Sequence, residues 1–334
     1  MTTVAIILVN WKGSADTLEC LTSVLQLSGD FRIHAIVVDN ASPDDSVVRI
    51  EQWLAGKGTV EIREAGAGPH WRAIVRAVTC EVSPNRYVSL VVGRSNNGFA
   101  AGNNIGIQFA DQLTTVDYYW ILNNDTTVHV DAVRHLCARM EANSSLGICG
   151  STLVHVQPAG RVQAYGGVHY SYVTGRGFHI GAGESIGAPP PNNVIEPQLT
   201  YVSGASMFVR RAFVERVGLM SERYFLYNEE LDWCWRGRGL FELGVATAAI
   251  VYHKEGMSIG TETQARPASI LSDFYQCRNK LMFAASFTPV CYPTVWIFIA
   301  ARALKRLRQG HFANAKVIAR VLLGCRSFKY YWTS

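Results

Sequence analysis

Tyr119-Trp120-Ile121-Leu122-Asn123-Asn124-Asp125-Thr126-Thr127-Val128 is the stretch that decides how the rest of the chain is interpreted. Its apolar run, bounded by turn formers, predicts a buried strand that ends in two amides and a carboxylate. Ligands of open α/β sheets bind at the carboxyl ends of the strands. Mg²⁺ and Mn²⁺ often take one or two protein carboxylates and complete their shell with substrate phosphates. Asp125 is therefore a candidate metal ligand. The alternative is an Asx turn that caps a helix beginning near Val128.

The regions on either side of this stretch predict alternating strands and helices. Apolar runs at residues 4–9, 34–38 and 87–92 predict strands, and helical spacing predicts helices at about 15–27 and 45–54. This order is typical of a Rossmann-like, mostly parallel sheet flanked by helices. No G-x-G-x-x-G follows the first strand, so the dinucleotide fingerprint is missing.

Two features near the predicted sheet edge favour ligand binding. The Gly- and Asn-rich segment 95–106 leads into a helix whose first N–H groups are free to bind phosphate, and its glycines allow a ligand to approach the backbone. The segment 158–197 is rich in Gly, Pro and Asn and predicts long loops or a small hairpin over the site, where we expect the acceptor lid. The segment 56–86 has no clear pattern.

An acidic cluster follows at residues 229–232. Helical spacing places Glu229, Asp232 and Arg236 along one side of a helix, with Glu230 nearer its exposed start. Three carboxylates in four residues beside aromatics are costly to bury without a function. The alternative is an ordinary acidic helix N-terminus, which the helix dipole favours. His253 follows a predicted strand at 243–251, and a lone histidine there is more often structural.

The composition describes a folded, core-rich chain. Of its 334 residues, 49% are hydrophobic and 17% are charged, and the net charge is +5. Eight cysteines without a C-x-x-C pair argue against a zinc knuckle or a disulfide framework and favour a reducing compartment. No basic segment precedes the first strand, so we expect no signal peptide and a cytoplasmic catalytic part.

The C-terminal region is strongly basic. No Asp or Glu follows Asp273, whereas ten basic residues do: Arg278, Lys280, Arg302, Lys305, Arg306, Arg308, Lys316, Arg320, Arg326 and Lys329. The apolar run at 290–304 is shorter than the roughly 20 residues of a membrane span. Together with a second basic helix at about 314–323, it predicts an interfacial helix on anionic lipid. The alternative is a helical bundle that packs on the domain or on a second subunit.

Seven stretches together resemble the family-2 glycosyltransferases, inverting enzymes of the GT-A fold, and most of all the rhamnosyltransferases of bacterial surface polysaccharides. They occur in the family's order across roughly residues 4 to 285, and include 6–11, 37–42, 96–104, 122–126, 204–207, 225–236 and 253–258. Residues 274–280 are similar to the helix that closes the catalytic domain of this subfamily. The resemblance implies a catalytic domain at 1–285, with a nucleotide-binding half at 1–125 and an acceptor-binding half at 126–285. A helical basic tail follows at 286–334.

The resemblance implies a donor site on the first half. Asp39 would hydrogen-bond the pyrimidine of a nucleotide sugar, and the backbone of Val9, Asn10 and Trp11 would wall the base. The ribose and diphosphate would lie along Asn97, Gly98 and Asn103. Asn123-Asn124-Asp125 occupies the place of the family's D-x-D triplet, so these three residues would line the diphosphate, with Asp125 on Mg²⁺ or Mn²⁺. His253 would be the second metal ligand.

The resemblance also implies the chemistry. Glu229-Glu230 stands where the family usually has Glu-Asp, so Glu230 matches the catalytic base, with Glu229 and Asp232 beside it. One in-line displacement would transfer rhamnose or a related deoxysugar from a dTDP- or UDP-sugar to a glycan or a lipid-linked acceptor. The basic tail, rather than the resemblance, predicts that the enzyme lies on the inner face of the plasma membrane, with a homodimer as the alternative contact.

Two other classes of function remain open. A nucleotidyltransferase shares Rossmann-like sheets and metal carboxylates, but its Gly-rich basic loop after the first strand is poorly matched by residues 10–14. A non-enzymatic basic adaptor for a membrane or nucleic acid rests on the tail alone. It leaves Asp39, Asp125 and Glu230 unexplained, and no nucleic-acid-binding motif is present.

Overall fold

The computed structural model describes residues 1–64, 72–254 and 268–328. They form two compact units. The first unit comprises the described residues of Met1–His169, Phe178–Arg223 and Glu230–Glu255, and the second those of Tyr170–Gly177, Tyr224–Glu229 and Gly256–Ser334. The Gly-rich piece at 66–71 and the motif residues 255–258 lie outside the described residues.

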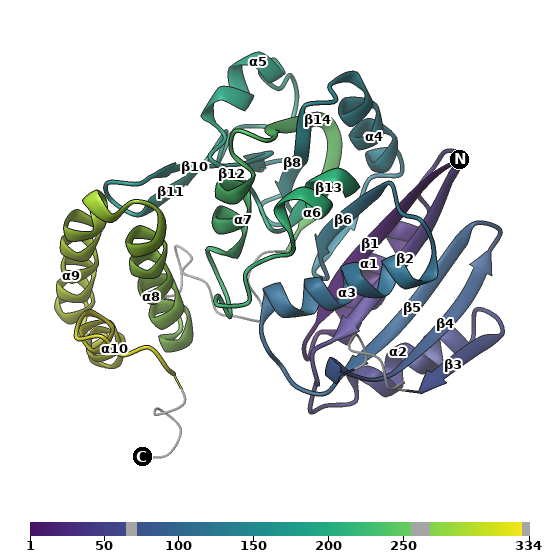
Figure 1. The fold of residues 1–334 in the computed structure, drawn as a ribbon, viewed down its shortest axis with the longest axis horizontal. Helices are drawn as coiled ribbons and strands as arrows, with labels where there is room; N and C mark the ends of the chain where they lie inside the picture. The colour runs from purple at the N-terminus through teal and green to yellow at the C-terminus, as the bar shows by residue number, and fades with distance from the viewer. Residues whose placement is uncertain (65–71, 255–267, 329–334) are drawn as a thin grey trace. The chain divides into compact units, whose positions relative to one another are not determined.

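The first unit is built on a sheet with the strand order β3-β4-β5-β2-β1-β6-β13-β8-β14-β7, and β9 pairs with β8 (Figure 1). Its four central strands are parallel: β5 (Arg86–Gly93), β2 (Phe31–Asp39), β1 (Thr2–Asn10) and β6 (Tyr118–Asn123). Residues 4–8 of β1 are 0% exposed. Such continuous burial is typical of parallel strands that are covered by helices on both faces.

Alternate residues of β1 point into two separate cores. Val4 and Ile6 pack in the core that contains residues of α1 (Ser14–Leu25), α2 (Ser46–Ala55) and α4 (Ala132–Ala142). Ile7 packs in the opposite core, which contains residues of α3 (Phe99–Leu113), α6 (Arg211–Val217) and α7 (Glu229–Gly237). A Cβ on Gly106 would lie 2.4 Å from Ile7, so this glycine allows α3 to approach the sheet.

Beyond β6 the sheet becomes mixed. Its remaining strands on this side are β7 (Thr126–Val128), β8 (Leu146–His155), β9 (Val162–Tyr165), β13 (Ser206–Arg210) and β14 (Glu242–His253). β13 runs antiparallel to both β6 and β8, whereas β14 runs parallel to β8 and antiparallel to β7. A second sheet has the order β11-β10-β12 and contains β10 (Gly167–Ser171), β11 (Arg176–His179) and β12 (Tyr201–Val202). The short helices α5 (Asn192–Ile195) and η2 (Glu196–Gln198) precede β12.

The predicted fold class is confirmed: the chain has a mostly parallel α/β sheet flanked by helices, with helices at its C-terminal end. Two details differ from the expectation. The unassigned segment 56–86 contains the antiparallel strands β3 (Val60–Glu64) and β4 (Ile74–Ser83), which extend the sheet. The single strand predicted at 201–209 is interrupted between β12 and β13 by a turn at 203–205.

The second unit is mainly helical. Its helices are α8 (Ile270–Phe287), α9 (Tyr292–Arg308) and α10 (Phe312–Leu322), with the turn η3 (Pro289–Cys291) between the first two. The two predicted tail helices are therefore present, and α8 shares their core rather than belonging to the first unit. Among the described helices, none has both the length and the apolar character needed to cross a bilayer.

Candidate active site

The parallel register places three polar residues together where their strands end. Asn10 is paired with Asp39 of β2, and its neighbour Val9 is paired with Asn123 of β6. All of these positions are therefore at one edge of the sheet, where α/β sheets bind ligands. Trp11 follows directly and is exposed.

A chain of hydrogen bonds links this edge to the turn after β6. Asn10 Nδ2 donates to Asp39 Oδ1 over 2.7 Å, and the Ser42 backbone N donates to Asp39 Oδ2 over 2.9 Å. Thr17 Oγ1 donates to Asn10 Oδ1 over 2.9 Å and accepts from Asn124 Nδ2 over 3.0 Å. The side chains of Asn10 and Asn124 therefore bind within the protein, and Asp39 is completely buried.

Asp125 and His253 are brought together by the pairing of β7 with β14. His253 is opposite Thr126 in that ladder, and its Nε2 lies 3.2 Å from Asp125 Oδ1. Its Nδ1 lies 2.9 Å from Gln163 Oε1 on β9, and Asn123 Nδ2 lies 3.4 Å from Nε2. Both members of the pair are buried. Two residues that lie 128 positions apart in the sequence thus form one polar group.

The hydrogen bond to Gln163 decides what the pair can bind. Because the amide oxygen can only accept, Nδ1 of His253 must donate to it, which leaves Nε2 facing the Asp125 carboxylate. A neutral imidazole would then place a lone pair against a carboxylate oxygen. A proton or a divalent cation between them removes this conflict, and a ligating histidine typically donates its other N–H to such an acceptor.

The residues fit one side of a divalent-cation shell. Among the residues that the structure describes, no cluster of three or more His, Cys, Asp or Glu could hold a metal ion. Asp125 and His253 alone therefore supply too few ligands for Mg²⁺ or Mn²⁺. Such ions commonly keep waters and take substrate phosphate oxygens for the remaining positions.

Glu230 is the second residue of α7, and its carboxylate lies against the turn between β12 and β13. A Cβ on Gly204 would fall 2.2 Å from Glu230 Oε1, so only glycine leaves room for this carboxylate. The next residue, Ala205, accepts a hydrogen bond from the Asn123 backbone N over 3.1 Å, which ties the turn to the end of β6. Burial raises the pKa of Glu230 to about 7. A carboxylate with this pKa can accept a proton near neutral pH.

The other two carboxylates of α7 have different surroundings. Glu229 is buried at the first residue of the helix. Asp232 accepts from Arg236 Nε over 2.7 Å, and the same guanidinium donates to the carbonyls of Val217 and Leu219 over 2.8 Å each. Arg236, paired with Asp232, therefore ties α7 to the end of α6 and the loop after it.

The start of α3 contains the remaining predicted donor-site residues. Asn97 is exposed, and its Nδ2 donates to Ser95 Oγ over 2.9 Å. Gly98 has φ +92°, and its carbonyl accepts from Asn40 Nδ2 over 3.0 Å. Asn103 is fully buried, and its Oδ1 has no hydrogen-bond partner among the described residues. An unsatisfied buried acceptor is rare and marks a place where a donor from water or ligand would be stabilising.

Sequence reasoning missed Gln163, Thr17 and Asn40. Gln163 lies in the Gly- and Pro-rich segment, where no periodicity announces β9. Thr17 is an ordinary helix residue in sequence, and only the approach of the turn at Asn124 reveals its role. Asn40 lies within a stretch that carried the family resemblance, but no role was assigned to it.

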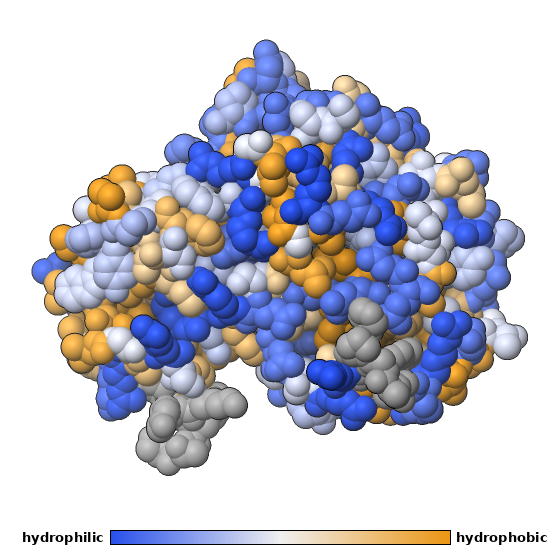
Figure 2. All heavy atoms as spheres, in the orientation of Figure 1, coloured by the Kyte–Doolittle hydropathy of each residue, from blue (hydrophilic) through white to orange (hydrophobic). Residues whose placement is uncertain are grey.

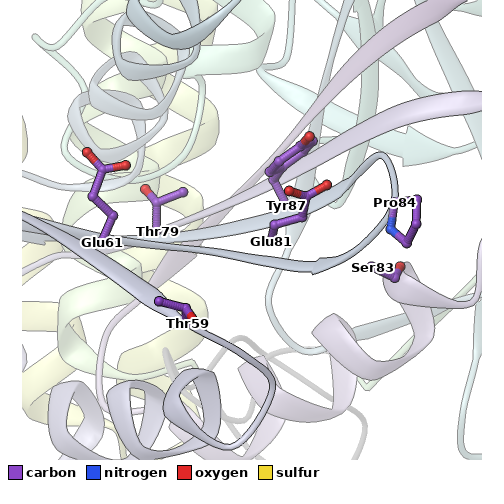
Figure 3. Close-up of a pocket in the computed structure, with 7 residues that line it drawn as sticks. All are labelled: Thr59, Glu61, Thr79, Glu81, Ser83, Pro84 and Tyr87. Atoms are coloured by element: carbon purple, nitrogen blue, oxygen red, sulfur yellow. The ribbon is translucent and has the colours of Figure 1, made fainter.

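The hollow in Figure 3 lies elsewhere and has a volume of about 600 Å³. Its lining comes from the β3, β4 and β5 side of the sheet and includes Thr59, Glu61, Thr79, Glu81, Ser83, Pro84 and Tyr87. Tyr87 is paired with His34 near the start of β5, whereas Asp39 is paired with Val92 at its end. The hollow is therefore at the opposite end of the strands from the polar group.

Comparisons with known proteins agree with this fold. No protein-family model matches the chain. A curated relative, the low-salt glycan biosynthesis hexosyltransferase Agl10 of Haloferax volcanii, is 20% identical over 220 residues. The alignment covers 64% of this chain and 66% of that protein, which is just under two thirds of the relative's length.

Three solved structures have the same fold. GalNAc-T7 with UDP, GalNAc and Mn²⁺ has a TM-score of 0.60 and 12% identity, covering 99% of this chain and 56% of that one. The mannosyltransferase PcManGT of Pyrobaculum calidifontis, in complex with GDP-Man and Mn²⁺, has a TM-score of 0.53 and 11% identity, covering 96% and 87%. TarS of S. aureus has a TM-score of 0.50 and 11% identity, covering 90% and 43%. At these identities the likeness shows the fold alone, and that fold is the GT-A type.

Proposed function

We propose that the chain is a glycosyltransferase that uses a nucleotide-sugar donor and a divalent cation. The observation that carries the proposal is the pair Asp125 and His253, whose Oδ1 and Nε2 atoms lie 3.2 Å apart at the carboxyl ends of the strands. Two similar folds, GalNAc-T7 and PcManGT, were solved with nucleotides and Mn²⁺. The curated relative is named a hexosyltransferase.

The proposed mechanism assigns a proton transfer to Glu230. Its carboxylate takes the proton from an acceptor hydroxyl as that oxygen attacks the anomeric carbon of the donor, and the bond to the diphosphate breaks. Mg²⁺ or Mn²⁺, when held by Asp125 and His253, would offset the charge that develops on the diphosphate. One displacement inverts the anomeric configuration. Glu229 is proposed to assist beside the base, and Asp232 to fix α7 through Arg236.

The donor half is proposed to take a dTDP- or UDP-sugar, as in family 2. Each oxygen of Asp39 accepts one protein hydrogen bond, which leaves a lone pair on each for an N–H of the base. Because Asp39 is 0% exposed, this contact requires that the residues covering it move aside. Asn97, Gly98 and the unsatisfied Oδ1 of Asn103 are proposed to face the ribose and diphosphate.

The sugar and acceptor are proposed by the same resemblance. Rhamnose or a related deoxysugar would be transferred to a glycan or lipid-linked acceptor in surface polysaccharide synthesis. A lipid-linked acceptor would place the reaction at a membrane surface, on the cytoplasmic side.

The test is nucleotide release from a panel of dTDP-, UDP- and GDP-sugars, with Mg²⁺ or Mn²⁺ and a lipid extract as acceptor. We expect one donor to be consumed, with activity lost in EDTA and in Asp125→Asn. Asp131→Asn makes the same chemical change at the N-terminal end of α4 and should be fully active. The proposal fails if no donor is bound in the presence of metal. It also fails if the protein instead consumes a nucleoside triphosphate and a sugar phosphate.

A further inference from the structure

The helix α9 presents an apolar face to solvent. Ile297 is 60% exposed, Leu304 is 55% exposed, Leu307 is 45% exposed and Trp296 is 38% exposed. Helical spacing places these side chains, with Pro293, on one side of the helix. In Figure 2, hydrophobic surface is visible over the helices of this unit. Surface helices normally expose their polar face, so an apolar exposed stripe marks an interaction site.

The adjoining face of α9 already packs in the core of the unit. Val295, Ile299 and Ala303 are buried there against residues of α8 and α10. The apolar surface of the helix is thus wider than the part that described residues cover. A helix that rests on a protein core typically has its apolar stripe covered and polar residues on the remaining surface.

The charges near the exposed face divide into two groups. Arg302 Nη2 lies 2.7 Å from Asp273 Oδ1, and Arg306 Nε lies 3.0 Å from Asp273 Oδ2. These two arginines, which the sequence assigned to lipid, are therefore held inside the unit by a buried aspartate. Lys305 and Arg308, in the last turn of α9, are exposed and remain at the edge of the apolar stripe.

The cationic character continues beyond α9. Lys316 is exposed on α10, and Arg326 follows that helix. No Asp or Glu occurs after Asp273 in the sequence, so the described residues of α9, α10 and the segment 323–328 contain no acidic side chain, and Asp273 on α8 is already paired with Arg302 and Arg306. The surface therefore combines an apolar stripe with a border of uncompensated positive charge.

We propose that this face docks on a membrane surface that contains anionic lipids. Such a surface accepts the apolar stripe at the boundary of head groups and acyl chains and supplies negative charge for the exposed lysines and arginines beside it. Aromatic side chains such as Tyr292 and Trp296 are favoured at that level. A second copy of the chain would instead bring a like-charged face to the contact. A spanning orientation is excluded for α9, which has 17 residues and ends in three basic ones.

The test is co-sedimentation of the full chain with vesicles of phosphatidylcholine alone, or of equal parts phosphatidylcholine and phosphatidylglycerol. We expect sedimentation with the anionic vesicles only, and its loss at high salt. Replacing Ile297 and Leu304 by Gln should weaken partitioning by at least about tenfold. Replacing Lys305 and Arg308 by Gln should weaken it by about 25-fold, at about fivefold per charge.

The matched control replaces Val48 and Ile62 by Gln, since these residues of α2 and β3 are 52% and 60% exposed in the first unit. This variant should sediment like the wild type. The proposal is overturned if the wild type ignores anionic vesicles, or if both α9 variants sediment as it does. It is also overturned if light scattering shows a wild-type dimer that the Ile297 and Leu304 changes dissociate, because a second copy then covers the face. The assay contains no donor or metal, so its result is separate from that of the donor assay.

Discussion

Asp125 and Asp273 are both buried aspartates, one in each unit, and their partners differ. Asp273 accepts from Arg302, Arg306 and Asn314, so both of its oxygens are satisfied. Asp125 faces His253, whose other nitrogen is already committed as a donor. Removing a buried carboxylate whose partners are complete leaves those partners buried and unpaired, so its role is structural. A carboxylate whose contact with a histidine is completed by a proton or a divalent cation is a candidate for function, so burial alone does not separate the two roles.

The same contrast exists within α7, between Glu230 and Asp232, and it yields the largest expected effect. Glu230→Gln should lower turnover by about 10²- to 10⁴-fold, because a general base contributes that much, while the donor still binds. Burial raises the pKa of Glu230 to about 7, so wild-type activity should fall as the pH drops below 7. Steady-state rates measured as a function of pH test the loss of turnover and the pH dependence. Calorimetry tests whether the variant still binds the donor.

Asp232→Asn is the control for that experiment. Because Asp232 pairs with Arg236, its loss should lower the melting temperature and leave the pH dependence of the rate unchanged.

The raised pKa of Glu230 also predicts how the stability of the protein depends on pH. The protonated form of Glu230 is favoured in the folded state, so its contribution is complete below the ordinary glutamate pKa and is lost as the pH rises through about 7. If Glu230→Gln is as active as the wild type, Glu230 is not the catalytic base.

Replacing each of the two buried aspartates, Asp125 and Asp273, by Asn tests the main comparison. Asp273→Asn leaves Arg306, which is 2% exposed, without its carboxylate, and should cost about 3–5 kcal/mol of unfolding free energy. Asp125→Asn should change stability by less than about 1 kcal/mol and abolish metal-dependent activity. Urea denaturation of both variants without metal measures the difference. Equal destabilisation by the two changes would mean that Asp125 is also a structural carboxylate.

Gln163 offers a smaller and more specific test of the metal pair. Gln163→Leu removes the acceptor that fixes the proton of His253 on Nδ1, and should weaken Mn²⁺ binding in the presence of nucleotide by about 10- to 100-fold. Gln198→Leu, on the short helix η2, is the control and should bind Mn²⁺ normally. Unchanged Mn²⁺ affinity in the Gln163 variant would show that the imidazole is not oriented for a metal.

The sequence predicted the parts of the fold that have strong local patterns. Continuous apolar runs identified β1, β2 and β6, and the end of β6 identified the polar stretch from Asn123 to Asp125, whereas the role of Asp39 came from the family resemblance. The pairing of Asp125 with His253 came only from the family resemblance, because no local pattern links residues 128 positions apart. Strand β3 escaped notice because it is a short, exposed edge strand without an apolar run.

The roles of other residues depend on contacts that spacing does not reveal. Arg302 and Arg306 read as surface charges in sequence, since their partner Asp273 lies on a different helix. Gly204 belongs to a stretch that carried the resemblance, yet its close approach to Glu230 exists only in the folded chain. Buried polar networks of this kind are defined by tertiary packing, which a single sequence does not encode locally.

A third kind of carboxylate completes the comparison and gives the smallest effect. Lys254 follows His253 and reaches Asp16 over 2.6 Å and Glu19 over 2.7 Å on α1. Glu19 is 55% exposed, so water and salt screen this contact, unlike those of Asp125 and Asp273. Lys254→Met should therefore cost less than about 1 kcal/mol in unfolding free energy, and the difference should vanish in high salt. A larger, salt-independent loss would mean that the backbone bond from Lys254 to the Asp125 carbonyl depends on the ammonium group, and that α1 helps to hold the metal pair in place.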